Sequence, residues 1–222
     1  YEAVGVTHRE LDIEDFVAVS AFIKAIRPDY VLHCAAISNT GTCERNPVLS
    51  EKVNVRGTIN LAKACRNAGS RMIFTSSDQI YNTSHSLEPN REGSEGKPGN
   101  VYGRDKKRAE EAMLTYLPDA VALRLTWMYD APSRGRAAGQ GLLQKLADAL
   151  KDRREVEFPV HDYRGITYVW EVVRHLEEAM GLPGGVYNFG SENRYNTFDT
   201  ARLFLRELAG SDSGGILKRN DE

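Results

Sequence analysis

Apolar and polar positions follow two alternating periods through the first 125 residues of the chain. Short, mostly apolar runs predict strands covered on both faces, because such strands have few polar positions. The expected strands are 2–6, 30–34, 72–74 and 121–125. Stretches with apolar residues at helical spacing, closed by Pro or Gly, predict helices. The expected helices are 12–26, 47–68 and 101–116. This alternation predicts an α/β protein with a Rossmann-type, doubly wound parallel sheet.

The pattern becomes less regular after residue 130. Two segments rich in small and polar residues, 82–100 and 131–140, predict long loops, and loops of this length are uncommon unless they serve a site. The other expected elements are a helix ending near 150, a strand at 156–158, a helix at 168–180 with Val172, Val173, Leu176 and Met180 inward, a strand at 186–189 and a helix at 197–208. Short strands mixed with helices predict a small α/β part that joins the main sheet.

Composition and charge narrow the class of protein. The chain has 222 residues, 41% of them hydrophobic, and a net charge of −2, so no basic excess favours nucleic acid. No apolar run approaches the roughly 20 residues that a membrane span needs. Cys34, Cys43 and Cys65 show no metal-ligand spacing, so we expect reduced thiols in a cytoplasmic protein and no metal site. The chain begins at Tyr1 and lacks a closing element, so we expect both ends to be incomplete.

Candidate chemistry follows the expected strands, because open parallel sheets bind ligands at the carboxyl ends of their strands. Ser77 comes just after the strand at 72–74, and Tyr102 and Lys106 lie four residues apart on one helical face. An ammonium group near a phenol lowers the pKa of the phenol, so Tyr102 could exchange protons. The hydroxyls of Ser77 and Tyr102 could then polarise one carbonyl oxygen. A surface tyrosine–lysine pair and a serine cap remain open as purely structural roles.

Four segments together resemble the extended short-chain dehydrogenases/reductases. They are Cys34-Ala35-Ala36, the run from Asn54 to Leu61, the run from Phe74 to Tyr81, and Tyr102-Gly103-Arg104-Asp105-Lys106. Within that group the chain is most similar to the dTDP-4-dehydrorhamnose reductase branch. The matches are Leu11-Asp12-Ile13, the stretch from Ala35 to Pro47, and the run from Leu123 to Tyr129. The resemblance extends from about Glu2 to Gly210.

The resemblance implies roles for individual residues. Ser77 would polarise the sugar carbonyl, Tyr102 would donate the proton, and Lys106 would also bind the nicotinamide ribose. The other implied cofactor-binding residues are Arg9, Asp12, Ile13, Cys34, Ala35, Ala36, Asn54, Thr75 and Ser76. The other implied substrate-binding residues are Ser38, Thr40, Asp78, Gln79, Trp127 and Arg164. Arg164 aligns with an arginine that binds the nucleotide diphosphate in related epimerases. Its alternative role is a surface ion pair. Residues 1–130 and 167–190 would form an NAD(P)-binding domain, and 131–166 and 191–222 a substrate-binding part.

Departures from the family pattern shape the remaining expectations. The first strand and Gly-rich loop that bind the cofactor pyrophosphate are absent from the sequence. Arg9 and the lack of an acidic residue after 2–6 favour NADP over NAD. Gln79 stands where sugar dehydratases have a general base and where the reductases usually have an aromatic residue. We therefore expect NADPH-dependent reduction of a nucleotide-linked 4-keto-6-deoxy sugar. An NAD-dependent nucleotide-sugar 4-epimerase, a non-catalytic dinucleotide-binding regulatory subunit and a homodimer remain possible under the resemblance.

Overall fold

The structure is a computed structural model that describes residues 2–84, 88–130, 141–210 and 215–221. The expected loop at 131–140 lies outside the described residues. The chain divides into two compact units, the first comprising Tyr1–Leu125 and Glu177–Asn188, the second Thr126–Leu176 and Phe189–Glu222. Residues 126–130, 167–176 and 189–190 thus group with the second unit, whereas we had expected them in the first.

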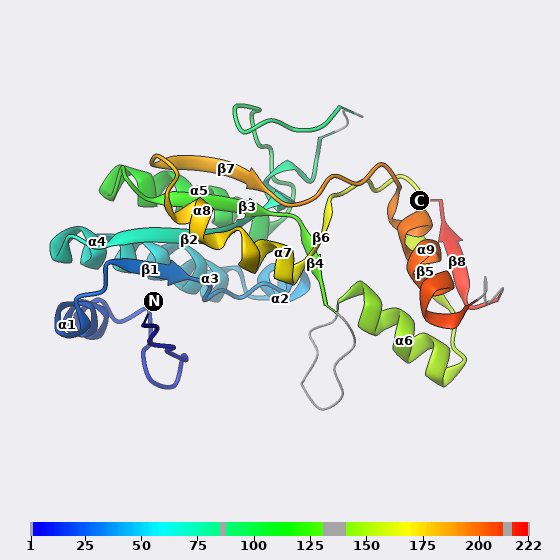
Figure 1. Cartoon of the computed structure of the whole chain (residues 1–222), viewed down its shortest axis with the longest axis horizontal. Coiled ribbons are helices and arrows are strands. Elements are labelled where there is room, and N and C mark those ends of the chain that lie inside the picture. The colour runs from blue at the N-terminus through cyan, green and yellow to red at the C-terminus, as the bar shows by residue number, and fades with distance from the viewer. Residues whose placement is uncertain (1, 85–87, 131–140, 211–214, 222) are drawn as a thin grey trace. The chain divides into compact units, whose positions relative to one another are not determined.

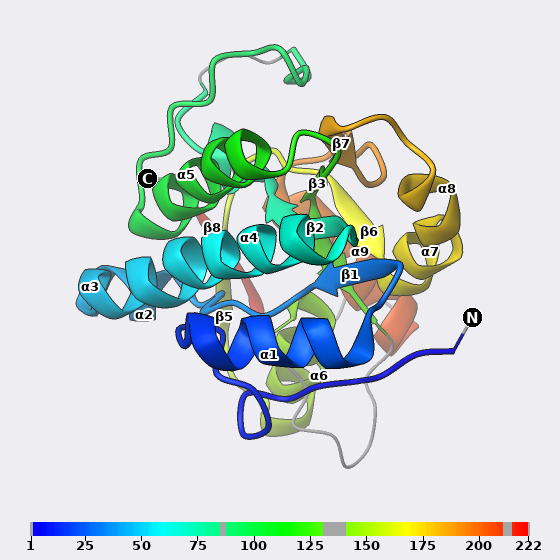
Figure 2. The same ribbon diagram turned by 90° about the vertical axis from the view of Figure 1, so that its left-hand side faces the viewer.

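The first unit is built on a sheet with the strand order β1-β2-β3-β7. Its strands are β1 (Tyr30–His33), β2 (Arg71–Ser77), β3 (Val121–Leu125) and β7 (Gly185–Phe189). The pairings of β2 with β1 and with β3 are both parallel, as predicted. Three helices lie side by side on one face of the sheet in both ribbon views (Figures 1 and 2): α1 (Phe16–Ile26), α4 (Thr58–Ala68) and α5 (Val101–Tyr116). The α/β fold with a Rossmann-type parallel sheet is confirmed.

Local sequence signals explain where these elements begin and end. The Asp15 carboxylate accepts hydrogen bonds from the first free N–H groups of α1, at Val17 and Ala18, which is how an N-cap stabilises a helix. Gly69 ends α4 in the left-handed region at a φ of 72°, which a glycine adopts at little cost. The bounds predicted for α5 and β3 agree with the structure residue for residue.

Two expectations for the first unit were wrong, one for residues 2–6 and one for the coverage of β1. Residues 2–6 form no strand. The helix predicted at 47–68 is confirmed, with a π-helical segment (Lys52–Gly57) between α3 (Pro47–Glu51) and α4. The strand β1 is not covered on both faces, since Tyr30 is 40% and Leu32 46% exposed. Within the described part of the chain, β1 stands at one end of the strand order, which leaves its residues fewer neighbours.

The second unit contains two small parallel pairings and its own core. The pairing of β4 (Trp127–Tyr129) with β6 (Ile166–Tyr168) is separate from that of β5 (Val156–Pro159) with β8 (Leu217–Asn220). The helices α6 (Leu142–Asp152) and α9 (Thr197–Ala209) enclose a core with β5. The predicted helices ending near 150 and at 197–208 and the strand at 156–158 are confirmed here, and β4, β6 and β8 were not foreseen.

The helix expected at 168–180 is interrupted. It consists of α7 (Val169–Arg174) and α8 (Leu176–Met180), with His175 between them outside helical geometry. The inward stripe expected from its spacing was wrong for Val173, which is 51% exposed, and no residue of α7 is buried. Helical periodicity alone could not reveal this break.

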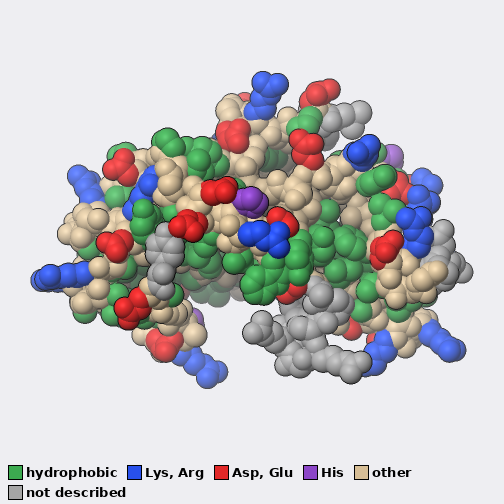
Figure 3. Space-filling view, in the orientation of Figure 1, with side chains coloured by type: hydrophobic (Ala, Val, Ile, Leu, Met, Phe, Trp, Pro, Cys, Tyr) green, Lys and Arg blue, Asp and Glu red, His purple; other side chains and the backbone are tan. Residues whose placement is uncertain are grey.

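The remaining short elements are α2 (Thr40–Arg45) and a 3₁₀ turn at Asp78–Tyr81. No helix in the described ranges is long and apolar enough to cross a bilayer. Figure 3 shows acidic and basic side chains interspersed over one face of the molecule, with hydrophobic side chains between them.

Candidate active site

Ser77 and Tyr102 meet at the carboxyl end of the sheet in the first unit. Ser77 is the last residue of β2, and Tyr102 lies in the first turn of α5. Both are nearly buried, at 8% and 9% exposure, and the Ser77 hydroxyl lies close enough to the Tyr102 hydroxyl to lower the pKa of that phenol. Two hydroxyls held this close can both contact one ligand oxygen.

The protein raises the pKa of Tyr102 to about 12. Burial is the largest cause, because a phenolate loses hydration there, and the hydrogen bond with Ser77 opposes it only in part. Our expectation that Lys106 lowers this pKa was therefore wrong for the protein as it stands. The Lys106 ammonium lies 5.7 Å from the centre of the tyrosine ring and is directed elsewhere.

Lys106 is itself buried, at 2% exposure. Its Nζ donates a hydrogen bond to the carbonyl oxygen of Thr75 at 2.8 Å and lies 4.4 Å from the centre of the Phe74 ring. Burial lowers the pKa of Lys106 to about 8. An ammonium has three N–H donors, and in the described residues one hydrogen bond of this group is seen. The arrangement therefore fits a further hydroxyl-bearing ligand, such as a ribose.

Asn54 fixes the segment that follows β1. Its Oδ1 accepts from the backbone N–H of Ile37 at 2.8 Å, and its Nδ2 donates to the Ile37 carbonyl at 3.1 Å. The same Nδ2 donates to Ser50 Oγ at 3.2 Å, and Ser50 donates to Asp105 Oδ2 at 2.6 Å. The amide thus connects the π-helical segment with the loop that carries Cys34, Ala35 and Ala36 and, through Ser50, with α5.

Residues 9–13 lie ahead of α1. Arg9 and Asp12 are exposed, and Asp12 accepts a hydrogen bond from the backbone N–H of Glu14 at 2.9 Å. Ile13 packs closely against Gly57, where a Cβ atom would lie 2.5 Å from Ile13 Cδ1. Any side chain at position 57 would require the Ile13 side chain to shift, so Ile13 packs in place against the end of the π-helical segment.

The other predicted residues of the first unit have mixed surroundings. Ser38 and Thr40 are exposed beside α2, and Asp78 Oδ1 lies 3.4 Å from Ser77 Oγ. Gln79 Oε1 accepts a hydrogen bond from Asn100 Nδ2 at 2.9 Å. Asn100 in turn caps α5 by accepting from the Gly103 N–H at 2.7 Å. The amide of Gln79 thus supports the start of the helix that carries Tyr102.

Trp127 and Arg164 come together in the second unit. The guanidinium of Arg164 lies 5.2 Å from the centre of the Trp127 ring, within range of a cation–π contact. It also forms an ion pair with Asp162, with Nη2 to Oδ2 at 2.8 Å and Nε to Oδ2 at 3.0 Å. Both charged side chains remain about one-third exposed. The ion pair foreseen as the alternative role of Arg164 is therefore present.

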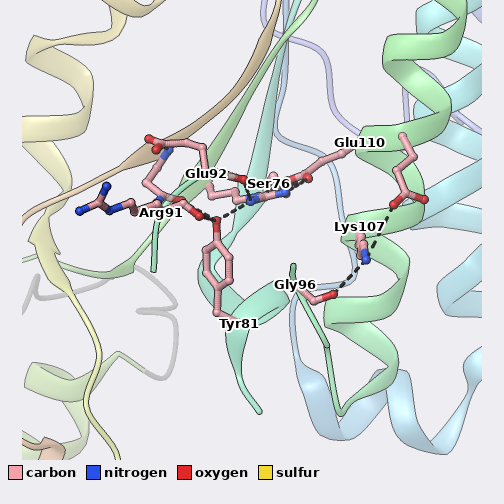
Figure 4. A network of polar contacts seen from close by, with 10 residues as sticks. Ser76, Tyr81, Arg91, Glu92, Gly96, Lys107 and Glu110 are labelled. Atoms are coloured by element: carbon pink, nitrogen blue, oxygen red, sulfur yellow. Dashed lines mark hydrogen bonds and ion pairs between the residues drawn. The ribbon is translucent and has the colours of Figure 1, made fainter. Parts of the chain in front are cut away.

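Sequence reasoning missed a buried polar network behind Ser77. Figure 4 shows Ser76, Tyr81 and Glu110 among its members. Glu110 forms an ion pair with Arg124, and the two side chains are only 2% and 8% exposed. Two signals were available: Glu110 follows Lys106 at helical spacing, and Arg124 interrupts an otherwise apolar strand. In the described residues, no cluster of three or more His, Cys, Asp or Glu side chains could hold a metal ion.

The family profile described as RmlD substrate binding domain matches residues 1–214 of the chain. The chain belongs to this family. It is 30% identical over 216 residues to the dTDP-4-keto-6-deoxy-D-glucose reductase of Streptomyces niveus, an alignment that covers 96% of this chain and 72% of that protein.

Two further members of the comparison show how far the likeness extends. The chain is 33% identical over 196 residues to methionine adenosyltransferase 2 subunit beta of Xenopus laevis, with 86% of this chain and 58% of that protein covered. The crystal structure of dTDP-4-dehydrorhamnose reductase from Bacillus anthracis, in complex with NADP, superposes with a TM-score of 0.88 at 21% identity, covering 99% of this chain and 76% of that one. At 21% identity, the likeness to the Bacillus anthracis structure shows the fold alone.

Proposed function

We propose that the protein reduces a nucleotide-linked 4-keto-6-deoxy sugar with NADPH. The observation that carries the proposal is the nearly buried Ser77–Tyr102 pair close to the buried Lys106. Membership of the RmlD substrate binding domain family and the likeness to a keto-sugar reductase support the same reaction.

Each of the three side chains has a role in this proposal. The hydroxyls of Ser77 and Tyr102 hold the carbonyl oxygen of the sugar, and Tyr102 donates the proton that this oxygen gains on reduction. A phenol whose pKa is raised to about 12 carries its proton at neutral pH, as a donor must. Lys106 uses its remaining N–H groups for the ribose hydroxyls of the cofactor.

The residues near Lys106 fit a nicotinamide cofactor in part. When bound, the cofactor supplies the hydride that reduces the carbonyl carbon. Lys106, Asn54, Thr75, Ser76 and the segment Cys34-Ala35-Ala36 would hold its nicotinamide half, and Arg9, Asp12 and Ile13 its adenosine half. Arg9 favours NADP over NAD. The first unit would then be the cofactor-binding part and the second the substrate-binding part.

Each unit carries residues that the resemblance implies for the sugar nucleotide. Ser38, Thr40, Asp78 and Gln79 follow strands of the first unit. In the second unit, Arg164 would bind the diphosphate, since a guanidinium with a half-exposed carboxylate partner can exchange that partner for a phosphate. Trp127, stacked on Arg164, would hold the guanidinium plane in position.

A Tyr102→Phe substitution in the full-length protein tests the proposed reaction. Consumption of NADPH in the presence of dTDP-4-keto-6-deoxy-glucose or dTDP-4-dehydrorhamnose should fall about 10²- to 10⁴-fold, while the binding of NADPH is retained. Tyr116→Phe, at the other end of the same helix, is the matched control and should leave the rate unchanged. If Tyr102→Phe keeps the wild-type rate, the assignment of Tyr102 is wrong.

The likeness to methionine adenosyltransferase 2 subunit beta supports a second candidate, a dinucleotide-binding regulatory subunit. In that case the wild-type protein would bind NADPH without consuming it and would co-purify with a partner enzyme. A 4-epimerase would instead interconvert nucleotide sugars without net consumption of cofactor. NADPH consumption therefore separates the reductase from the other two functions, and sugar interconversion or co-purification with a partner enzyme then separates those two.

A further inference from the structure

Three polar links join the end of β2 to successive turns of α5. Tyr102 meets Ser77 and Lys106 meets the carbonyl of Thr75. Glu110, one helical turn beyond Lys106, accepts a hydrogen bond from the hydroxyl of Ser76. The proposed reaction uses the first two links and leaves the third without a role.

The Glu110 carboxylate is almost fully buried and fully engaged. Besides the Ser76 hydroxyl, its Oε1 accepts from Arg124 Nε at 3.0 Å, and its Oε2 accepts from Arg124 Nη2 at 2.7 Å. This two-pronged geometry is the strong form of an arginine–carboxylate pair. It fixes the position of the carboxylate within the unit.

Arg124 is itself held from its other side. Its Nη1 donates to the hydroxyl of Tyr81 and, at 3.3 Å, to the carbonyl of Glu92. Tyr81 donates onward to Asn188 Oδ1 at 3.0 Å. Figure 4 shows this chain of contacts running from the helix that carries Glu110 to the loop around Glu92. The guanidinium cannot move without breaking contacts on two sides.

A buried ion pair is weak evidence for a contribution to stability, because the desolvation of two charges offsets their attraction. An apolar pair of similar volume would often serve the fold as well. The location of this pair, directly behind the reacting side chains, suggests what else it does.

We infer that Glu110, held by Arg124, is a positioning residue for the proposed reaction: it fixes β2 on α5 and holds its negative charge one helical turn from Lys106. This inference rests on the proposed function for its role in turnover. The charge on Lys106 can also be tested without turnover.

The groups that face Lys106 come from four elements. They are His33 on β1, Cys34 after it, Cys43 on α2, and Tyr102 and Glu110 on α5. Burial holds the pKa of His33 near 3 and that of Tyr102 near 12, so both are neutral at pH 7. Burial likewise raises the pKa of Cys34, and Cys43 donates its S–H proton to the Ile37 carbonyl. Against the effect of burial, Cys34, then Glu110, then Cys43 raise the pKa of Lys106, and of these three groups Glu110 is the carboxylate.

Glu110→Gln in the full-length protein is the central test. Glutamine can still accept from Ser76 but carries no charge. We expect the alkaline limb of the pH profile of kcat/KM to move at least half a unit to lower pH, with a loss in kcat of about tenfold or more. The matched control is Glu111→Gln, on the next residue, whose side chain is 65% exposed and pairs with Lys107 at 3.9 Å. The control should show the wild-type profile.

A second variant separates positioning from folding. Glu110→Leu combined with Arg124→Met removes both charges together, so no charge stays buried without its partner. If the Glu110–Arg124 pair serves only the fold, the folded double variant should have the wild-type pH profile and kcat. That result would overturn the inference. An alkaline limb of kcat/KM that moves to lower pH in the folded double variant supports the inference.

Unfolding measurements test the inference without any substrate. Lys106 has a pKa near 8 in the folded protein and an ordinary value of 10.5, so its contribution to stability rises with pH between these values. The difference in unfolding free energy between each background and its Lys106→Met derivative isolates this contribution. In Glu110→Gln the rise should begin at lower pH; an unchanged onset contradicts the inference. If the wild type lacks reductase activity, the proposed function fails and this titration still decides the role of Glu110.

Discussion

Two arginine–carboxylate pairs of this protein have the same chemistry and different surroundings. The Glu110–Arg124 pair in the first unit is buried, with side chains 2% and 8% exposed, whereas Asp162 and Arg164 in the second unit remain 32% and 31% exposed. Arg124 has further protein partners at Tyr81 and Glu92. Arg164 stacks on Trp127 and leaves part of its guanidinium in contact with solvent. A buried pair fixes structure, while a half-exposed pair can exchange its partner for a ligand.

Replacing each arginine in turn is the most direct test of this difference between the two ion pairs. Arg124→Met leaves Glu110 buried and unpaired, and we expect a loss of about 3–5 kcal/mol in the free energy of unfolding. Arg164→Met leaves Asp162 free to be hydrated, and we expect a loss of about 0–1 kcal/mol. Urea denaturation of both variants measures the difference. Equal losses would mean that burial does not distinguish the two pairs.

The buried His33 and the exposed His161 provide a second contrast, with a smaller expected effect on the free energy of unfolding. His33 is buried in the first unit, stacks on Phe74 and lies 3.0 Å from Thr58 Oγ1. Burial, and secondarily Lys106, lower the pKa of His33 to about 3. Between pH 6.5 and 3, His33 is therefore protonated in the unfolded chain and neutral in the folded protein. The free energy of unfolding falls as the pH falls through this range.

His33→Gln should remove this acid sensitivity. Relative to the variant, the wild type should lose up to about 1.4 kcal/mol of unfolding free energy for each pH unit below 6.5. His161→Gln, at an exposed position of the second unit, is the control and should leave the acid-induced loss in place. Parallel pH dependences of the wild type and His33→Gln would refute the prediction.

The same contrast explains which parts of the fold the sequence could predict. The first unit has long apolar runs, and β3 and α5 were predicted with their observed bounds. In the second unit β4, β6 and β8 have three or four residues, too few to show a clear period, and they were missed, although the equally short β5 was predicted. The break at His175 has no proline or glycine to mark it.

The candidate site shows a similar limit. Helical spacing placed Tyr102 and Lys106 on one face, and strand order placed Ser77 near them. The balance between burial and charge could not be read from spacing, so the direction of the Tyr102 pKa shift was wrong. The partners of Asn54 and Gln79 lie 17 and 21 residues away, and such contacts depend on packing.

Two asparagine caps provide the smallest and most local comparison. Asn100 caps α5 and Asn196 caps α9, each by accepting a backbone N–H at 2.7 Å. Asn100 differs because its Nδ2 also donates to Gln79 Oε1 at 2.9 Å. Serine preserves a cap but has no amide to donate. Asn100→Ser should therefore cost about 1 kcal/mol in unfolding free energy, and Asn196→Ser about 0.5 kcal/mol or less.

A measurement of kcat gives a second difference between the two asparagine caps. Because Asn100 lies two residues before Tyr102, loosening its link to Gln79 should also lower kcat a few-fold in the proposed reaction, whereas Asn196→Ser should leave kcat unchanged. Asn100→Ala is the further control, since it removes the cap as well and should cost more in stability than Asn100→Ser. If the two serine variants behave alike in both stability and kcat, Gln79 does not position the start of α5, and its amide is then available to contact the substrate directly.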